Sequence, residues 1–163
     1  MWWRLPAAQW RAGKGNANRR ALQRIVRRGT APGLLAYAAR KPIGWCALAP
    51  RAAFPRLATS RILKPVDEQA VWSVTCFFVA REFRRRGVTV ELLKAAVKFA
   101  QAHGAEIVEG YPVDAPRGQP DVFVYTGLVS AFRRAGFKEV ARRSATRPIM
   151  RCVCKGEIEP RSP

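Results

Sequence analysis

The chain is poor in the residues from which metal centres and membrane segments are built. Its 163 residues contain one histidine, and the four cysteines form no C-x-x-C pair, which argues against a metal site. No apolar run approaches the roughly eighteen residues of a membrane span, and the N-terminus lacks the apolar core of a signal peptide. We therefore expect reduced cysteines, no metal, no membrane span and a cytoplasmic protein.

Acidic residues are also scarce, with 11 Asp and Glu against 30 Lys and Arg, a formal net charge of +19. Such an excess attracts polyanions, so weak nonspecific binding of nucleic acid is expected. Site-specific recognition is not favoured, because the chain has no zinc-finger spacing, no basic heptad region and no RNP-type aromatic pattern. The length predicts a single domain over residues 1–155, with a frayed tail at 156–163.

The most informative stretch joins a strand, a turn and a helix. Residues Val74–Val79 form a short apolar run rich in β-branched and aromatic side chains, which predicts a buried strand. After an arginine-bearing turn at Arg81–Gly87, apolar residues recur at helical spacing as far as Ala100, and His103-Gly104 ends the predicted helix.

The turn before this helix has the chemistry of an anion site. The first N–H groups of a helix lack intrahelical partners and carry a partial positive charge. Three consecutive arginines, Arg84 to Arg86, add formal charge, and Gly87 lets a ligand approach the backbone. The spacing is neither that of a P-loop nor that of a G-x-G-x-x-G turn. The residues therefore predict a phosphate or pyrophosphate cradle.

At this turn the sequence resembles the acetyl-CoA loop of the GNAT superfamily of N-acetyltransferases, V-x-P-x-x-R-x-x-G-x-G/A. The chain has Val79, Arg81 in the proline place, Arg84, Gly87 and Thr89 in the last small place. A second segment, LVSAFRRAGFKEV at 128–140, resembles the late helix and Gly-Phe turn of the family. With the hairpin below, the resemblance covers roughly two-thirds of the chain, and the opening Trp-Trp resembles an actinobacterial-looking group of members.

Two residues depart from the family pattern. Thr89 is bulkier than the usual Gly or Ala, and Phe132 replaces a tyrosine that many members use as the acid to the CoA thiolate. The resemblance implies a GNAT-like α/β fold, a mixed, mostly antiparallel sheet with a splayed fourth and fifth strand and flanking helices. It also implies acetyl-CoA as co-substrate, bound by Phe77, Phe78, Val79, Arg84, Arg85, Arg86, Gly87, Val88, Thr89 and Phe132.

The remaining elements are predicted from hydrophobic periodicity and from the glycine and proline residues between the segments. A helix over Arg19–Arg28 is expected to turn Leu22, Ile25 and Val26 inward. The irregular segment Ala52–Asp67 is either a lid over the acceptor site or a packed excursion. The other expected elements are a hairpin of Gly33–Ala39 and Ile43–Ala49, a strand Glu106–Val113, a loop Asp114–Thr126, a helix Leu128–Ala135 and strands Phe137–Arg142 and Pro148–Val153.

Candidate catalytic residues lie where the resemblance places the splayed strands. Glu109 and Asp114 are candidates for the base that takes a proton from the acceptor amine, although Glu109 could equally be a salt-bridged strand residue. Tyr111 or Tyr125 would have to supply any phenolic acid. Cys76 is disfavoured as an acyl-carrying nucleophile because no histidine lies near it in sequence.

The resemblance favours an acetyl-CoA-dependent N-acetyltransferase that moves the acetyl group directly to a primary amine of a small molecule. Alternatives are protein or peptide N-acetylation, and a non-catalytic acyl-CoA-binding or nucleic-acid-binding module. A cationic acceptor would need a local acidic pocket, for which Glu109, Asp114 and Asp121 are the candidates. A homodimer is possible, because many proteins of this fold pair through late strands.

Overall fold

The computed structural model describes residues 1–114 and 124–154. The mixed, mostly antiparallel sheet is confirmed: its order is β1-β2-β3-β4-β6-β5, and only β3 and β4 run parallel. Its strands are β1 Gly33–Ala38, β2 Lys41–Pro50, β3 Trp72–Val79, β4 Ile107–Gly110, β5 Lys138–Arg142 and β6 Pro148–Val153. The helices are α1 Ala7–Ala12, α2 Asn16–Arg27, α3 Pro55–Ala58, α4 Val88–Ala102 and α5 Val129–Arg134, and the 3-10 turns are η1 Trp2–Arg4, η2 Arg51–Ala53 and η3 Arg81–Phe83.

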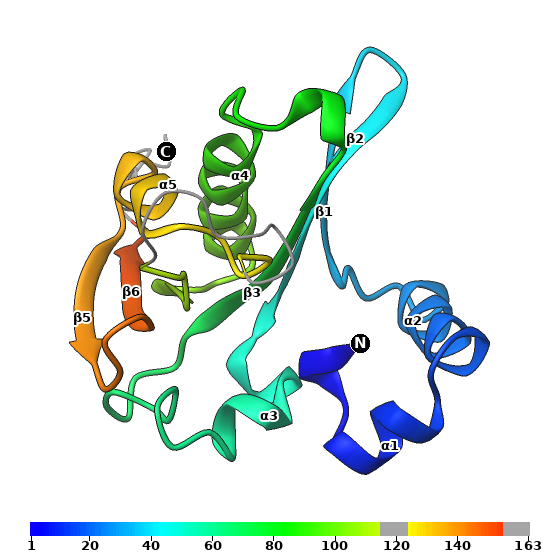
Figure 1. Ribbon diagram of the computed structural model, residues 1–163, viewed down its shortest axis with the longest axis horizontal. Helices are drawn as coiled ribbons and strands as arrows, with labels where there is room; N and C mark the ends of the chain where they lie inside the picture. The colour runs from blue at the N-terminus through cyan, green and yellow to red at the C-terminus, as the bar shows by residue number, and fades with distance from the viewer. Residues whose placement is uncertain (115–123, 155–163) are drawn as a thin grey trace, which may run out of the picture.

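The two parallel strands separate after a short ladder. β3 pairs with β4 only from Trp72 opposite Val108 to Val74 opposite Gly110, after which β4 ends and β3 continues to Val79. The ladder between β2 and β3 is irregular at the same level, where Thr75 has no partner on β2. Such a bulge increases the local twist of a strand. The outer half of β3 therefore lacks a neighbouring strand on its β4 side (Figure 1).

Each face of the sheet carries its own apolar cluster. Helices α4 and α5 cover one face, and the larger cluster lies beneath them, with Val74, Leu93 and Phe132 fully buried. On the other face, Phe54 and Leu57 pack with Tyr111 and Ile149. The segment predicted as either a lid or a packed excursion therefore contributes buried side chains to this second cluster.

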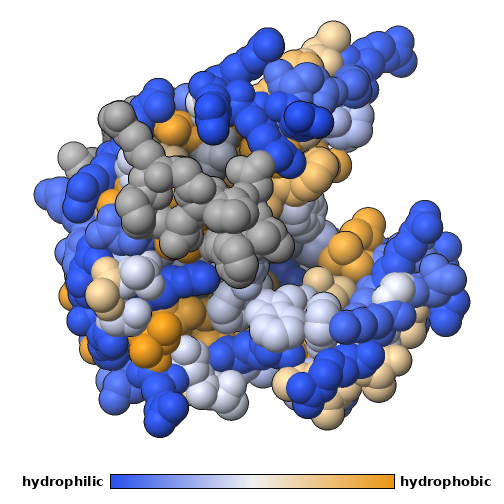
Figure 2. Space-filling model, viewed as in Figure 1, coloured by the Kyte–Doolittle hydropathy of each residue, from blue (hydrophilic) through white to orange (hydrophobic). Residues whose placement is uncertain are grey.

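The N-terminal arm of α1 and α2 stands apart from the sheet (Figure 1). The prediction that Leu22, Ile25 and Val26 turn inward holds only in part: Leu22 and Ile25 are half-buried, but Val26 is 55% exposed and no residue of α2 is fully buried. Figure 2 shows a hollow between this arm and the projecting end of the β1–β2 hairpin. Amphipathic spacing identified the helix but not that its apolar side would be only half covered.

Most predicted elements are present with shifted ends. The strand predicted at Glu106–Val113 is shorter, because the chain turns out of the ladder at Tyr111-Pro112 and proline cannot donate a ladder hydrogen bond. Most of the loop predicted at 114–126 and the tail predicted at 156–163 lie outside the described residues. No helix in the described ranges is long and apolar enough to cross a membrane.

The ring of Phe132 lies against the glycine at the end of β4. A Cβ added at Gly110 would lie 2.1 Å from a ring carbon of Phe132. We predict that Gly110→Ala lowers the free energy of unfolding by about 1–3 kcal/mol, the usual cost of overpacking a core. Chemical denaturation should show a smaller loss for the same change in a Phe132→Leu background. Equal losses in the two backgrounds would contradict this contact.

Candidate functional site

A cavity of about 1390 Å³ opens where β3 and β4 separate. Its walls come from the end of β3, the turn before α4, the first turn of α4, α5 and the chain on both sides of the segment 115–123. Eight of the ten residues predicted to bind the cofactor line it: Phe77, Phe78, Val79, Arg84, Arg85, Gly87, Val88 and Thr89. The strand edge and the helix terminus, predicted separately, therefore face one cavity.

The N-terminus of α4 is built to receive an anion. Gly87 precedes the helix in the left-handed region, with φ of 83°, and no side chain caps the helix there. The Gly87 carbonyl accepts hydrogen bonds from the N–H groups of Val90 and Glu91. The N–H groups of Val88 and Thr89 belong to the first turn, whose donors have no intrahelical acceptor. These donors lie at the cavity wall.

The arginines of the turn divide into two groups. Arg84 and Arg85 line the cavity, and the Arg84 Nε donates to the Val79 carbonyl at 3.0 Å. Arg86 does not line it, and its guanidinium lies 5.8 Å from the centre of the Phe83 ring. Sequence reasoning missed two further arginines, Arg133 and Arg134 of α5, which lie on the opposite wall. Their position in the late-helix motif was the only signal for them.

The free edge of β3 presents backbone groups to the cavity. The Ala80 N–H donates to Ile43 beside β2, whereas the Phe77 N–H donates to the Tyr125 carbonyl at 2.7 Å on the other side. Successive residues of a strand direct their N–H groups to opposite edges. Val79 therefore faces the Tyr125 side. The predicted contact near Phe78 falls on the edge that pairs with β2.

Tyr125 and Asp114 are the two predicted catalytic residues that line the cavity. Tyr125 is half-buried, and burial raises the pKa of its phenol, which therefore stays protonated at neutral pH. Asp114 is exposed, and its carboxylate lies 2.8 Å from the Arg142 guanidinium. The site thus contains a neutral phenol and an ion-paired carboxylate on neighbouring walls.

Glu109 is a salt-bridged strand residue, the second of the two expectations for it, and Tyr111 lies beside it and not at the cavity. Both are fully buried on the sheet face covered by the segment 51–67, and neither lines the cavity. The Glu109 carboxylate accepts from Arg51 at 2.6 Å and from Arg151 at 2.8 Å, and the Tyr111 hydroxyl also donates to it. The alternation of a strand sends both side chains to the face opposite α4.

Arg51 ties this network to the irregular segment. Its guanidinium donates to the carbonyls of Leu57 and Leu63 as well as to Glu109, and Arg151 also pairs with Asp67. The sequence contained no signal for the ion pairs with Glu109 and Asp67, because their partners lie 42 to 84 residues apart. Burial of the phenol is the largest of the effects that raise the pKa of Tyr111, which keeps its proton.

Phe132 also lies elsewhere than predicted. Its ring is fully buried and packs edge-on against Phe77 and Phe137, at centroid distances of 6.1 and 5.0 Å, and it does not line the cavity. Gly110 and Gly127 leave the room that the ring occupies. A tyrosine hydroxyl at this position would need a hydrogen-bond partner, whereas phenylalanine needs none.

The described residues contain no group of three His, Cys, Asp or Glu side chains that could hold a metal ion. All four cysteines are free thiols. Burial raises the pKa of Cys76, with smaller opposing effects from the terminal amine and from Trp45. A protonated thiol is a poor nucleophile, which agrees with the sequence-based argument against Cys76 as an acyl carrier.

The separated parallel strands, the free edge of β3 and the uncapped helix terminus at the cavity are the arrangement expected of an acyl-CoA-dependent acyltransferase. The model of the acetyltransferase (GNAT) family matches residues 1–125, and the chain belongs to that family. The match covers the predicted acetyl-CoA loop and the strand that precedes it. No curated protein has a significantly similar sequence.

Solved structures share the fold at low sequence identity. A GNAT-family protein from Desulfovibrio desulfuricans has a TM-score of 0.55 at 16% identity, covering 83% of this chain and 78% of its own. A GNAT-family acetyltransferase from Streptococcus agalactiae has a TM-score of 0.55 at 11% identity, covering 92% and 80%. A ribosomal-protein-alanine N-acetyltransferase from Brucella melitensis has a TM-score of 0.51 at 15% identity, covering 83% and 76%.

The position of Glu109 predicts a structural effect of its removal. Glu109→Gln should lower the free energy of unfolding by about 3–5 kcal/mol, because the largely buried Arg51 loses its counter-charge and Arg151 keeps only Asp67. The matched control is Glu91→Gln, which removes an exposed partner of Lys94 and should cost less than about 1 kcal/mol. Urea denaturation measures both. An unchanged stability together with lost activity would instead assign Glu109 to the chemistry.

Proposed function

We propose that the protein is an acetyl-CoA-dependent N-acetyltransferase that transfers the acetyl group directly to a primary amine of a small molecule. The observation that carries this proposal is the single cavity that joins the N-terminus of α4 to the free edge of β3. The first suits the pyrophosphate of acetyl-CoA, and the second suits the amide groups of the pantetheine arm. We propose acetyl-CoA and the amine acceptor as the partners, in the cytoplasm.

In the proposed complex, the pyrophosphate lies on the N–H groups of Val88 and Thr89, with the arginines of both walls around it. The pantetheine arm runs along β3 and accepts a hydrogen bond from the Val79 N–H, because the Val79 carbonyl already accepts one from Arg84. The thioester then lies in the gap between β3 and β4. The protein binds the co-substrate in an extended form and holds its carbonyl where an amine can reach it, which supplies catalysis by orientation.

The reaction needs one proton removed and one delivered. The neutral amine attacks the thioester carbonyl, the C–S bond breaks, and CoA leaves as a thiolate. We assign the proton delivered to the sulfur to Tyr125, the half-buried phenol on the cavity wall. Asp114 accepts the amine proton, directly or through a water. Among the described residues, it is the one whose carboxylate lines the cavity.

We assign the other predicted residues to the fold. Glu109 and Tyr111 hold β4 to the segment 51–67, and Phe132 fills the space beside Gly110. A protein or peptide acceptor remains an alternative outcome of the acceptor screen described below. Homodimer formation and weak nonspecific binding of nucleic acid stay predictions.

Binding of acetyl-CoA tests the cradle. Acetyl-CoA at a hundred times its dissociation constant should add about 2.7 kcal/mol to stability, and at roughly 2–4 °C per kcal/mol the melting temperature should rise by several degrees. Gly87→Glu should abolish most of the shift, because it puts a carboxylate at the helix terminus that binds the pyrophosphate. Differential scanning fluorimetry measures this effect.

Two variants serve as controls for that experiment. Gly87→Ala strains the same backbone without adding charge, and Ala95→Glu adds the same charge to an exposed position of α4. Both should retain most of the shift. If Ala95→Glu loses as much as Gly87→Glu, or if ATP and a short DNA duplex give equal shifts, the turn is only a generic positive surface and the cradle is refuted.

Turnover tests the chemistry. Release of CoA thiol is followed with acetyl-CoA and a panel of primary amines, and Tyr125→Phe should reduce kcat by about 10²-fold, at the lower end for a general acid because thiolate is a good leaving group. The KM for acetyl-CoA should change little. Tyr37→Phe removes an exposed hydroxyl on β1 and should have no effect. Binding of acetyl-CoA without turnover of any amine would instead favour a non-catalytic acyl-CoA-binding module.

A further inference from the structure

Three large apolar or aromatic side chains are exposed on the first and third strands of the sheet. Leu35 is 53% exposed and Tyr37 57%, both on β1, and Phe78 of β3 is 60% exposed. Single exposed apolar side chains are common in proteins, whereas exposed ones that adjoin one another mark a binding surface. The positions of these three relative to one another therefore decide what they mean.

The strand register places these side chains in a row. Leu35 lies opposite Trp45 of β2, and Trp45 lies opposite Phe78 of β3. Residues opposite each other point to the same face, and neighbouring strands lie about 4.8 Å apart, so the row is about 10 Å long. Gly33 leaves room for the Trp45 ring, because a Cβ there would lie 2.7 Å from a ring carbon. We call Leu35, Tyr37, Trp45 and Phe78 the apolar patch.

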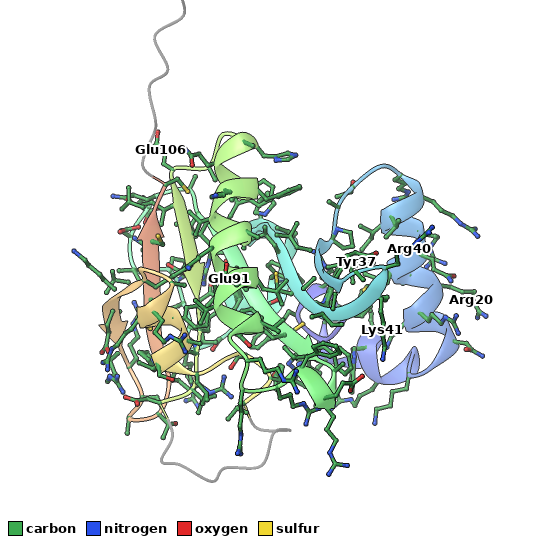
Figure 3. The ribbon with its side chains drawn as sticks, turned by 90° about the horizontal axis from the view of Figure 1, so that it is seen from above. Arg20, Tyr37, Arg40, Lys41, Glu91 and Glu106 are labelled. Carbon is green, nitrogen blue, oxygen red and sulfur yellow. The ribbon has the colours of Figure 1, made fainter. Side chains whose placement is uncertain are left out.

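The apolar patch lies on the face of the sheet away from α4. A Cβ added at Gly44 would lie 3.0 Å from Val88 of α4 and 3.4 Å from Ala36 of β1, so Ala36 faces α4. Strand alternation turns its neighbours Leu35 and Tyr37 to the other face. Figure 3 shows Tyr37 on the side of the N-terminal arm, with α4 across the sheet. The hollow beside the arm (Figure 2) lies on this same side.

The apolar patch is continuous with the cavity in which the thioester is proposed to lie. Phe78 and Val79 point to opposite faces of β3, yet both line the cavity. The cavity therefore reaches round the free edge of β3 to the face that carries the patch. Tyr125 lines the same cavity, and its carbonyl accepts a hydrogen bond from the Phe77 N–H. A molecule that lies on the patch thus has a path past Phe78 into the gap.

The charge on this side of the molecule narrows the choice of occupant. The first 66 residues, from η1 to beyond α3, contain eleven arginines and three lysines but no aspartate or glutamate. Figure 3 shows Arg20, Arg40 and Lys41 on the same side as Tyr37. A surface of one sign repels like charge. This argues against a second copy of the chain, which would bring the same charges, and against an acceptor with several ammonium groups.

We propose that the acceptor is a small monoamine with an apolar, preferably aromatic, body that lies on the apolar patch while its amine enters the gap past Phe78. This inference rests on the proposed acetyl transfer and narrows its acceptor. The body packs against Leu35 and Trp45, and a row of about 10 Å fits one ring system with a short chain. The amine then attacks the thioester from the face opposite α4, and the bonds and protons change as proposed above.

The test compares primary amines of similar basicity that differ in their apolar body. Phenethylamine is compared with methoxyethylamine, and kcat/KM is measured from the release of CoA thiol. The wild-type protein should prefer phenethylamine by about tenfold to a hundredfold, the range for burying one large apolar side chain. Tryptamine should share the preference. Spermidine, which carries several ammonium groups, should react more slowly than phenethylamine.

Two variants test the patch itself. Leu35→Thr and Trp45→Thr should each reduce the preference by about threefold to tenfold, because each removes part of the apolar contact and threonine still suits a strand. Neither residue lines the cavity, so both variants should keep the acetyl-CoA melting shift. The matched control is Val140→Thr, at a 42% exposed position of β5, which should keep the preference. Because Trp45 is half-buried and its loss can lower stability, the exposed Leu35 provides the decisive variant.

The outcomes separate the two proposals. If acetyl-CoA gives no melting shift, the proposed function fails. If methoxyethylamine reacts as well as phenethylamine, or if both threonine variants keep the full preference, the acetyl transfer stands and the apolar acceptor is refuted. Where no amine turns over, calorimetric titration of the CoA complex with the same two amines decides, and equal binding refutes the site. Dimerisation in sedimentation velocity that Leu35→Thr abolishes would assign the patch to a second copy and also overturn the proposal.

Discussion

The separation of β3 from β4 is the constraint on which the site depends. Two parallel strands that stayed paired would leave no free edge for a thioester arm, and the cavity would close. The ladder ends at Gly110 because Tyr111 is anchored on the far face of the sheet and Pro112 cannot continue the hydrogen bonding. The ring of Phe132 occupies the space next to Gly110. Packing on both faces therefore fixes the point at which the strands part.

The ion network around Glu109 holds the short strand β4 in place where it separates from β3. A short β4 makes few ladder bonds, and a carboxylate bound by Arg51 and Arg151 ties the strand to β6 and to the segment 51–67. Desolvating three charges is costly, so the network contributes little net stability over an apolar cluster, but breaking it leaves buried charge unpaired. Its value lies in specifying one arrangement of the irregular segment against the sheet.

Part of the excess positive charge of the protein lies at the cavity. Around the cavity, arginines from the turn before α4 and from α5 face the space proposed for the phosphates of acetyl-CoA. The long-range attraction of an anionic co-substrate comes from the whole positive charge, whereas the specificity of the site comes from its local geometry.

The sequence alone determined the elements whose signals are local. Local patterns correctly predicted four features: the apolar run of β3, the periodicity of α4, the turn at Gly87 and the hairpin of β1 and β2. Eight of the residues predicted to bind the cofactor line one cavity. These signals depend on neighbours within a few residues. They also sufficed to identify the family, because its acetyl-CoA loop is a continuous motif.

Only the tertiary structure decided which side chains share a site. Glu109 and Asp114 are both acidic residues near one strand end, yet Glu109 is buried between two arginines and Asp114 lines the cavity. The face to which each side chain points depends on the register and the partners of β4, which the local sequence does not specify. Amphipathic spacing in α2 predicted an inward-facing side, whereas Leu22 and Ile25 are only half-buried and Val26 is exposed. The pairing of Arg51 with Glu109, and that of Arg151 with Asp67, join residues far apart in the chain. Periodicity and turn chemistry hold no information about such contacts, since these arise from the packing of whole elements.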